Sequence, residues 1–131
     1  MRRNEQQTKY AKMWNETGID FIIAPSNPAA ATAHGETVWD GYTGVWNALD
    51  HTAVAFPVTT VQASDTYGNF PRRNKAPLTE KDAYYINAYK AGPSKYANAP
   101  VALQVIGRRH TEEKMLKVVE VVHSILSSNT E

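Results

Sequence analysis

Cysteine is absent from the 131-residue chain, so disulfides and thiol chemistry are excluded, while the redox compartment is left open. None of the seven glycines forms a G-x-G pair, which argues against a phosphate-cradling nucleotide loop. The G-x-S-x-G pattern of a nucleophile elbow is missing too. The four histidines are scattered and not arranged at metal-ligand spacing. We therefore expect no metal site, no cofactor and no local catalytic motif.

The chain also has no large excess of positive or negative charge and no long apolar run. The net charge is +1 and the pI about 8.0, below the value of about 9 that is typical of basic nucleic-acid-binding domains. No apolar run approaches the roughly 20 residues of a membrane-spanning helix, and residues 1–18 lack the apolar core of a secretory signal. We expect a cytoplasmic protein with no nucleic-acid partner and no membrane span, and keep a basic nucleic-acid binder as a weak alternative.

The chain does contain an alternation of helical and extended patterns. Four segments have helical periodicity or capping residues: 3–16, 42–49, 79–89 and 111–126. Three short apolar runs predict strands: 21–24, 53–61 and 101–106. The alternation predicts an α/β fold in which helices flank part of a mainly parallel or mixed β-sheet. A chain of this length forms one domain or a piece of a larger one.

Single residues refine this prediction. Gly18 stands where a left-handed residue would end the first helix. Pro57 predicts an edge position or a bulge for its strand, because proline donates no ladder hydrogen bond. The polar stretch at 62–77 is predicted to be a loop, and Thr111 to cap the last helix.

Trp39, Tyr42 and Trp46 lie within eight residues of one another. Packing beneath a loop is the simpler interpretation, because aromatic side chains carry much of the burial in any core, and an apolar ligand pocket is the alternative. His34 follows a loop of small residues; a solvated side chain is the simpler interpretation and a pocket role the alternative. Four residues of the helix predicted at 79–89 are interpreted as surface and packing residues: Asp82, Tyr84, Tyr85 and Tyr89.

A series of motifs resembles the amidase signature family, in particular the fungal general amidases and the fatty-acid amide hydrolases. Its members typically have an Asp-containing strand that ends in proline, a small-residue loop with a nearby histidine, a Tyr-Thr pair, and a last strand and turn before an acidic-start helix. The matching segments are 20–25, 28–34, 42–43, 47–50, 57–61, 100–104 and 107–109. Thr52 stands where proline is usual, and Asn98 stands where glycine is frequent.

The resemblance implies amide hydrolysis by a serine nucleophile that a second serine and a lysine activate, without metal or cofactor. In the family these residues belong to an upstream Gly-Ser-rich segment, and the present sequence has no such run. We therefore expect residues 1–131 to be a fragment, the C-terminal segment of an amidase-like domain, in which no catalytic residue can be assigned. A catalytically inactive amidase-like interaction module is the alternative.

The resemblance also implies part of a substrate pocket. The stretch that borders the acyl side of the substrate in eukaryotic members corresponds to residues 37–44, and four of these are the expected substrate-pocket residues: Thr37, Asp40, Tyr42 and Gly44. The implied ligand is a small-molecule amide. We also expect self-association, or pairing with a missing N-terminal segment, because the family's sheet is larger than three strands.

Overall fold

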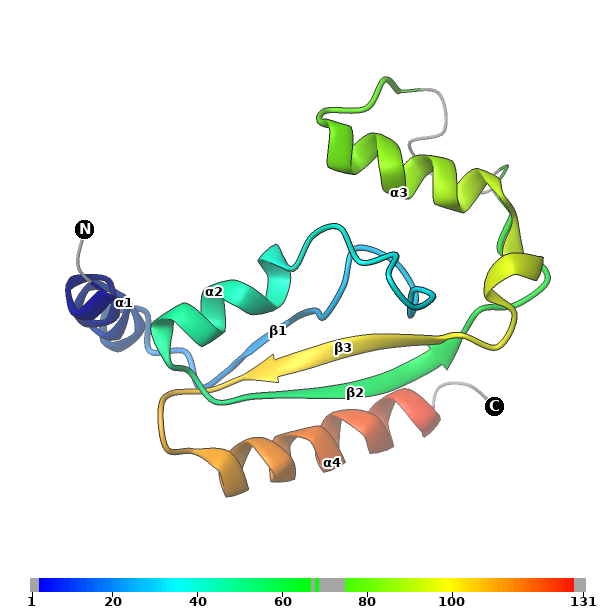
Figure 1. Ribbon diagram of the computed structural model, residues 1–131. Coiled ribbons are helices and arrows are strands. Elements are labelled where there is room, and N and C mark those ends of the chain that lie inside the picture. Colours follow the sequence, from blue (N-terminus) through cyan, green and yellow to red (C-terminus); the bar gives the residue numbers. More distant parts are fainter. Residues whose placement is uncertain (1–2, 67, 69–74, 129–131) are drawn as a thin grey trace.

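The computed structural model describes residues 3–66, 68 and 75–128, in which helices and strands alternate (Figure 1). The helices are α1 (Arg3–Thr17), α2 (Gly41–Leu49), α3 (Glu80–Lys90) and α4 (Glu112–Ser128). The strands are β1 (Ile22–Pro25), β2 (Ala53–Thr60) and β3 (Pro100–Ile106), and the short 3-10 helix η2 (Pro93–Tyr96) precedes β3. All seven predicted elements are therefore confirmed. Residues 67 and 69–74 of the predicted polar loop lie outside the described residues.

The strands form one sheet in the order β1-β3-β2, and both pairings are antiparallel. The α/β class with flanking helices is confirmed, but the mainly parallel pairing favoured by the alternation is wrong for these strands. The reason is visible in Figure 1: the connection through α3 and η2 leaves β2 and enters β3 at the same end of the sheet, so β3 runs back alongside β2. β1 and β2 run in the same direction, with β3 inserted between them.

Pro57 lies in β2, which is an edge strand of the described sheet. The register of β2 against β3 shifts between Pro57 and Thr59. A proline without an amide hydrogen is accommodated where the ladder is interrupted, so the predicted edge position and bulge are both confirmed.

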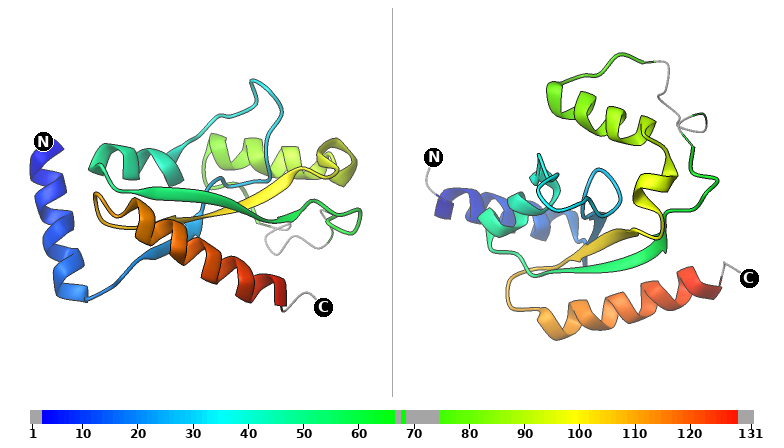
Figure 2. Two further views of the ribbon diagram at one scale, coloured as in Figure 1. Left: turned by 90° about the horizontal axis from the view of Figure 1, so that it is seen from below. Right: turned by 45° about the vertical axis from the view of Figure 1, so that its right-hand side comes forward.

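The main core lies between the sheet and α4, which runs along one face while α2 lies over the other (Figures 1 and 2). Phe56, Val105 and Met115 are buried there, and several aliphatic side chains pack around them, including Val119 and Val122. Met115, Val119 and Val122 thus form the inner face of α4, at the spacing of three and four residues typical of a helix that packs on one side. Leu126 lies outside this core and is 39% exposed.

The turns before β1 and after β3, which lie at the same end of the sheet, have local causes. Gly18 ends α1 with φ of 66° and donates to the carbonyl of Trp14, so the predicted left-handed cap is confirmed. At the β3–α4 turn, a Cβ on Gly107 would overlap the Met115 side chain, so this position requires glycine. The hydroxyl of Thr111 donates to the Arg108 carbonyl at 2.7 Å and so ties the start of α4 to the turn.

Candidate functional site

A groove lies between α3 and the segment that leads into α2. On the α2 side, the rings of Trp39 and Tyr42 meet edge to face with centroids 5.0 Å apart. The α3 side presents Tyr85 and Tyr89, and the small residues 28–29 complete the lining of a space of about 640 Å³. A concave, aromatic surface of this size suits an apolar ligand. The pocket alternative considered for Trp39 and Tyr42 is therefore the arrangement that the structure favours.

A second cavity of about 370 Å³ adjoins this groove between α3, η2 and β3. Tyr85 and Tyr89 line both spaces, and Tyr84 lines the second one. The three tyrosines were interpreted from the sequence as surface and packing residues, whereas here they form cavity walls. The Tyr85 hydroxyl is buried and has no hydrogen-bond partner among the described residues. A buried hydroxyl without a partner costs free energy, so a polar ligand atom at this position would be favourable.

Polar contacts hold η2 against the loop that follows β1. Lys95 Nζ lies 2.8 Å from Glu36 Oε1, and the Tyr96 hydroxyl donates to Glu36 Oε2 at 3.4 Å. The hydrogen bond to Glu36 raises the pKa of Lys95 above its ordinary value of 10.5. Burial raises the pKa of the Tyr84 hydroxyl above 10.0, and the negative charge of Glu36 adds to this shift. The arm formed by α3 and η2 is thus fastened to the rest of the molecule near a charged pair.

The four expected pocket residues follow one another along the chain, but they have different surroundings. Tyr42 lines the groove. The carbonyl of Asp40 accepts from the amide of Gly44 at 2.7 Å, so these two residues meet in the first turn of α2. Thr37 instead shares a hydrogen bond of 3.0 Å with Thr32 in the preceding loop. Neither Thr37 nor the Asp40–Gly44 pair lines the groove, and their contact with a substrate stays a prediction.

An aromatic cluster that the sequence analysis missed surrounds His51 at the end of α2. The His51 ring stacks on Trp14 at 4.9 Å, while Tyr10 and Trp46 approach it edge-on. Its Nδ1 donates to the Gly107 carbonyl at 2.7 Å. Trp46 therefore belongs to this packed cluster and not to the groove, which confirms the packing interpretation for Trp46. The Tyr10–Trp14 pair, four residues apart on one helix face, was the only sequence signal for the cluster.

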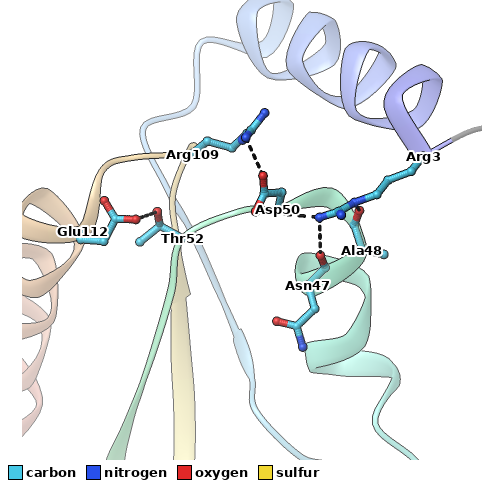
Figure 3. Close-up of polar contacts among 7 residues, drawn as sticks. All are labelled: Arg3, Asn47, Ala48, Asp50, Thr52, Arg109 and Glu112. Carbon is cyan, nitrogen blue, oxygen red and sulfur yellow. Dashed lines mark hydrogen bonds and ion pairs between the residues drawn. The ribbon is translucent and has the colours of Figure 1, made fainter.

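Beside this cluster, Asp50 joins three segments of the chain (Figure 3). Arg109, from the β3–α4 turn, places Nη2 2.6 Å from one Asp50 oxygen, and Arg3 of α1 lies 3.9 Å from the other. Thr52 Oγ1 donates to Glu112 at 3.0 Å and so links the start of β2 to α4. These contacts fix the end of the sheet opposite to α3.

Other kinds of site have little support in the described part of the chain. His34 is exposed and lines neither cavity. No group of three or more His, Asp or Glu side chains gathers as a metal site within residues 3–66, 68 and 75–128. None of the helices in these ranges has the length and apolar character needed to cross a membrane.

Comparison with known proteins decides the family. A family model described as Amidase matches residues 1–116. The chain belongs to the amidase family. Two curated relatives are acetamidases, from Emericella nidulans and Aspergillus oryzae, which are 37% and 36% identical to this amidase chain over 93% and 92% of its length. The resemblance inferred from the motifs is thereby confirmed.

The amidase chain spans 22% of the length of each of these acetamidases. A solved structure of fatty acid amide hydrolase matches 95% of it with a TM-score of 0.81 and covers 22% of that enzyme. The sequence identity to this structure is 24%, so the match shows a shared fold.

Proposed function

We propose that this chain is the C-terminal part of a hydrolase that cleaves amide carbon–nitrogen bonds, and that the nucleophilic serine, the second serine and the lysine lie outside it. The observation that supports this is the amidase match over residues 1–116 in a chain that spans 22% of its acetamidase relatives. The sequence itself has no Gly-Ser-rich run that could hold these groups.

In this proposal the groove beneath α3 forms one wall of the substrate pocket. The apolar part of a small-molecule amide packs against Trp39, Tyr42 and Tyr85, which line the groove. The predicted residues Thr37, Asp40 and Gly44 do not line the groove, and we propose that they contact the substrate from the adjoining segment. The scissile carbonyl then faces the residues outside the chain, where a lysine of lowered pKa takes the proton from the serine that attacks. The reaction needs no metal or cofactor.

The test compares the isolated chain with a chimera. The chimera carries this chain in place of the matching segment of the Emericella nidulans acetamidase. We expect it to release ammonia from acetamide or a long-chain fatty amide, and to be labelled on one serine by a fluorophosphonate. The isolated chain should match the uncatalysed rate and stay unlabelled. Stoichiometric labelling of a serine in the isolated chain would contradict the proposal, and a folded but inactive chimera would favour the interaction module.

We further propose that the chain alone self-associates or pairs with the remainder of an amidase domain. Ile23 on β1 and Val121 and Ile125 on α4 support this, because their side chains are 46%, 49% and 54% exposed. The cytoplasmic location and the fragment nature stay predictions. Cell fractionation of the tagged natural protein, with its mass on a denaturing gel, checks both.

A further inference from the structure

Gln104 is a buried polar side chain at the centre of the sheet, with 2% of its surface exposed. Its neighbours Leu103 and Val105 belong to the core beneath α4. Side chains alternate between the two faces of a strand, so Gln104 points to the opposite face, where α2 lies. A polar group in this position needs partners, because an unsatisfied buried amide is costly.

Both partners of Gln104 are backbone carbonyls from other segments. Nε2 donates to the carbonyl of Pro25 at 2.8 Å and to the carbonyl of Tyr42 at 2.7 Å. A side-chain amide nitrogen carries two hydrogens, and both are used here. One nitrogen atom therefore joins the last residue of β1 to the first turn of α2.

These two carbonyls belong to two of the three segments that form the groove, the third being α3. Pro25 leads into the small-residue loop, whose residues 28–29 line the groove, and Tyr42 lines it directly. The loop is also anchored by Ser26, whose hydroxyl donates to the Ala102 carbonyl at 3.0 Å. Among the described residues, Gln104 is the residue of β3 whose side chain donates to α2. The loop and the helix are thus connected directly through one buried amide.

We propose that Gln104 is a positioning residue, which fixes the separation between the loop after β1 and the start of α2 and thereby the shape of the side of the groove that faces α3. It touches no substrate. This inference rests on the proposed function only in that it treats the groove as part of a substrate pocket. The separation between the loop and the start of α2 is a property of the chain itself and can be measured without catalysis.

The absence of cysteine makes this measurement direct, because two introduced cysteines carry the only spin labels. Ala31 in the loop and Val45 on α2 are exposed and suit the labels. Gln104→Met keeps a side chain of similar length but has no hydrogen to donate, so the distance distribution between the labels should shift or broaden by more than about 2 Å. Val105→Ala is the control: it opens the α4 core on the other face and should leave the distribution unchanged.

An unchanged distribution in Gln104→Met would overturn the proposal. Equal broadening in Val105→Ala would overturn it as well, because it would show general loosening. Gln104→Glu gives a second, reversible test: its carboxyl donates one hydrogen bond when protonated and none when ionised, so the distribution should narrow as the pH is lowered within the folded range. A distribution that is independent of pH in this variant would count against the role.

In the acetamidase chimera, Gln104→Met should raise KM about tenfold while kcat changes less than about threefold, because a displaced wall weakens substrate binding. Val105→Ala should change neither. An unchanged KM would overturn the link between wall spacing and binding. An inactive parent chimera would be a failure of the proposed function, and the spin-label result would still decide the positioning role.

Discussion

At position 98 the backbone has φ of 61°, in the left-handed region that glycine and asparagine tolerate best. Asparagine is therefore one of the few residues besides glycine that fit this turn. The Asn98 amide donates to the carbonyl of Val61, and the Val61 amide donates to the carbonyl of Ala99, so the turn aligns β2 with β3.

Asn98→Gly should therefore leave the free energy of unfolding within about 0.5 kcal/mol of the parent, whereas Asn98→Val should lower it by about 1–2 kcal/mol, because a β-branched residue is strained at positive φ. Urea denaturation followed by circular dichroism measures both values. Equal stability of the Val variant and the parent would show that the left-handed turn is not required.

The charged pair at η2 gives a prediction about alkaline pH. Lys95 and Tyr84 both have pKa values raised in the folded protein, so the folded state holds their protons more tightly than the unfolded state does. Their contribution to the free energy of unfolding is complete below the ordinary pKa values of 10.0 for Tyr84 and 10.5 for Lys95. It is lost as the pH rises through the raised pKa values of the folded protein. Stability should therefore fall above about pH 10.

Thermal melts at pH 8, 10 and 11 would follow this loss, each compared with a Lys95→Gln, Tyr84→Phe double variant. Between pH 8 and pH 11 the melting temperature of the variant should fall less than that of the parent. Identical pH profiles would show that these two groups do not carry the effect.

Among the elements, α4 depends most on its inner face. Val122 packs against the core of Phe56, Val105 and Met115, whereas its neighbour Val121 is 49% exposed. Val122→Asp should lower the free energy of unfolding by about 2–4 kcal/mol, because it buries a carboxylate and removes apolar contact. Val121→Asp is the matched control on the same helix and should cost less than about 1 kcal/mol.

The melting temperatures of the two variants, measured in parallel, test this docking of α4. If both variants melt like the parent, α4 is not packed on the sheet as described. If both fall equally, the inner and outer faces of the helix are not distinct.

The elements themselves follow from local sequence. Thr79 begins α3 by accepting from the Asp82 amide at 3.1 Å, as its side chain predicts, and the apolar period of residues 115–122 identifies α4. Strand pairing and the groove do not follow in the same way. β1 pairs with β3 across most of the chain, and Tyr42 lines one groove with residues of α3 that follow it by some 40 positions. Both arrangements depend on the folded chain, and no local pattern encodes them.

The contacts of Asp50 and of Gln104 could not be predicted from the sequence for the same reason. The Gln104 side chain is recognisable in the sequence as the polar member of an apolar strand, yet its partners at positions 25 and 42 are not. The family resemblance identified the stretch that contains Tyr42, but it did not identify the tyrosines of α3. These residues were missed because cavity walls assemble from several segments only after the chain has folded.

On the scale of the whole molecule, both edges of the described sheet and part of α4 are uncovered. β1 and β2 each have β3 as their neighbour on one side, and Phe21 and Val118 line an apolar groove beside α4. Unpaired strand edges and apolar grooves recruit other chains. We therefore predict that the isolated protein forms dimers or larger species in proportion to its concentration.

Size-exclusion chromatography with light scattering at several concentrations measures this. Val121→Lys, in the apolar groove, should lower the oligomer fraction, while Val38→Lys, at an exposed position elsewhere, is the control. A monomer at high concentration that melts cooperatively and binds no apolar dye would contradict the prediction and would favour a self-sufficient interaction module.

The central place of β3 has a consequence for biosynthesis. A ribosome makes β1 first, but the partner of β1 is made about 80 residues later, which at about 5–20 residues per second is a delay of roughly 4–16 s. β2 is likewise complete before β3 exists, and β1 and β2 are not neighbours in the sheet. β1 lacks β3 throughout this interval, and β2 lacks it from the time when residue 60 has been made. Its yield in a cell therefore depends on chaperone capture during translation as well as on the stability of the finished fold.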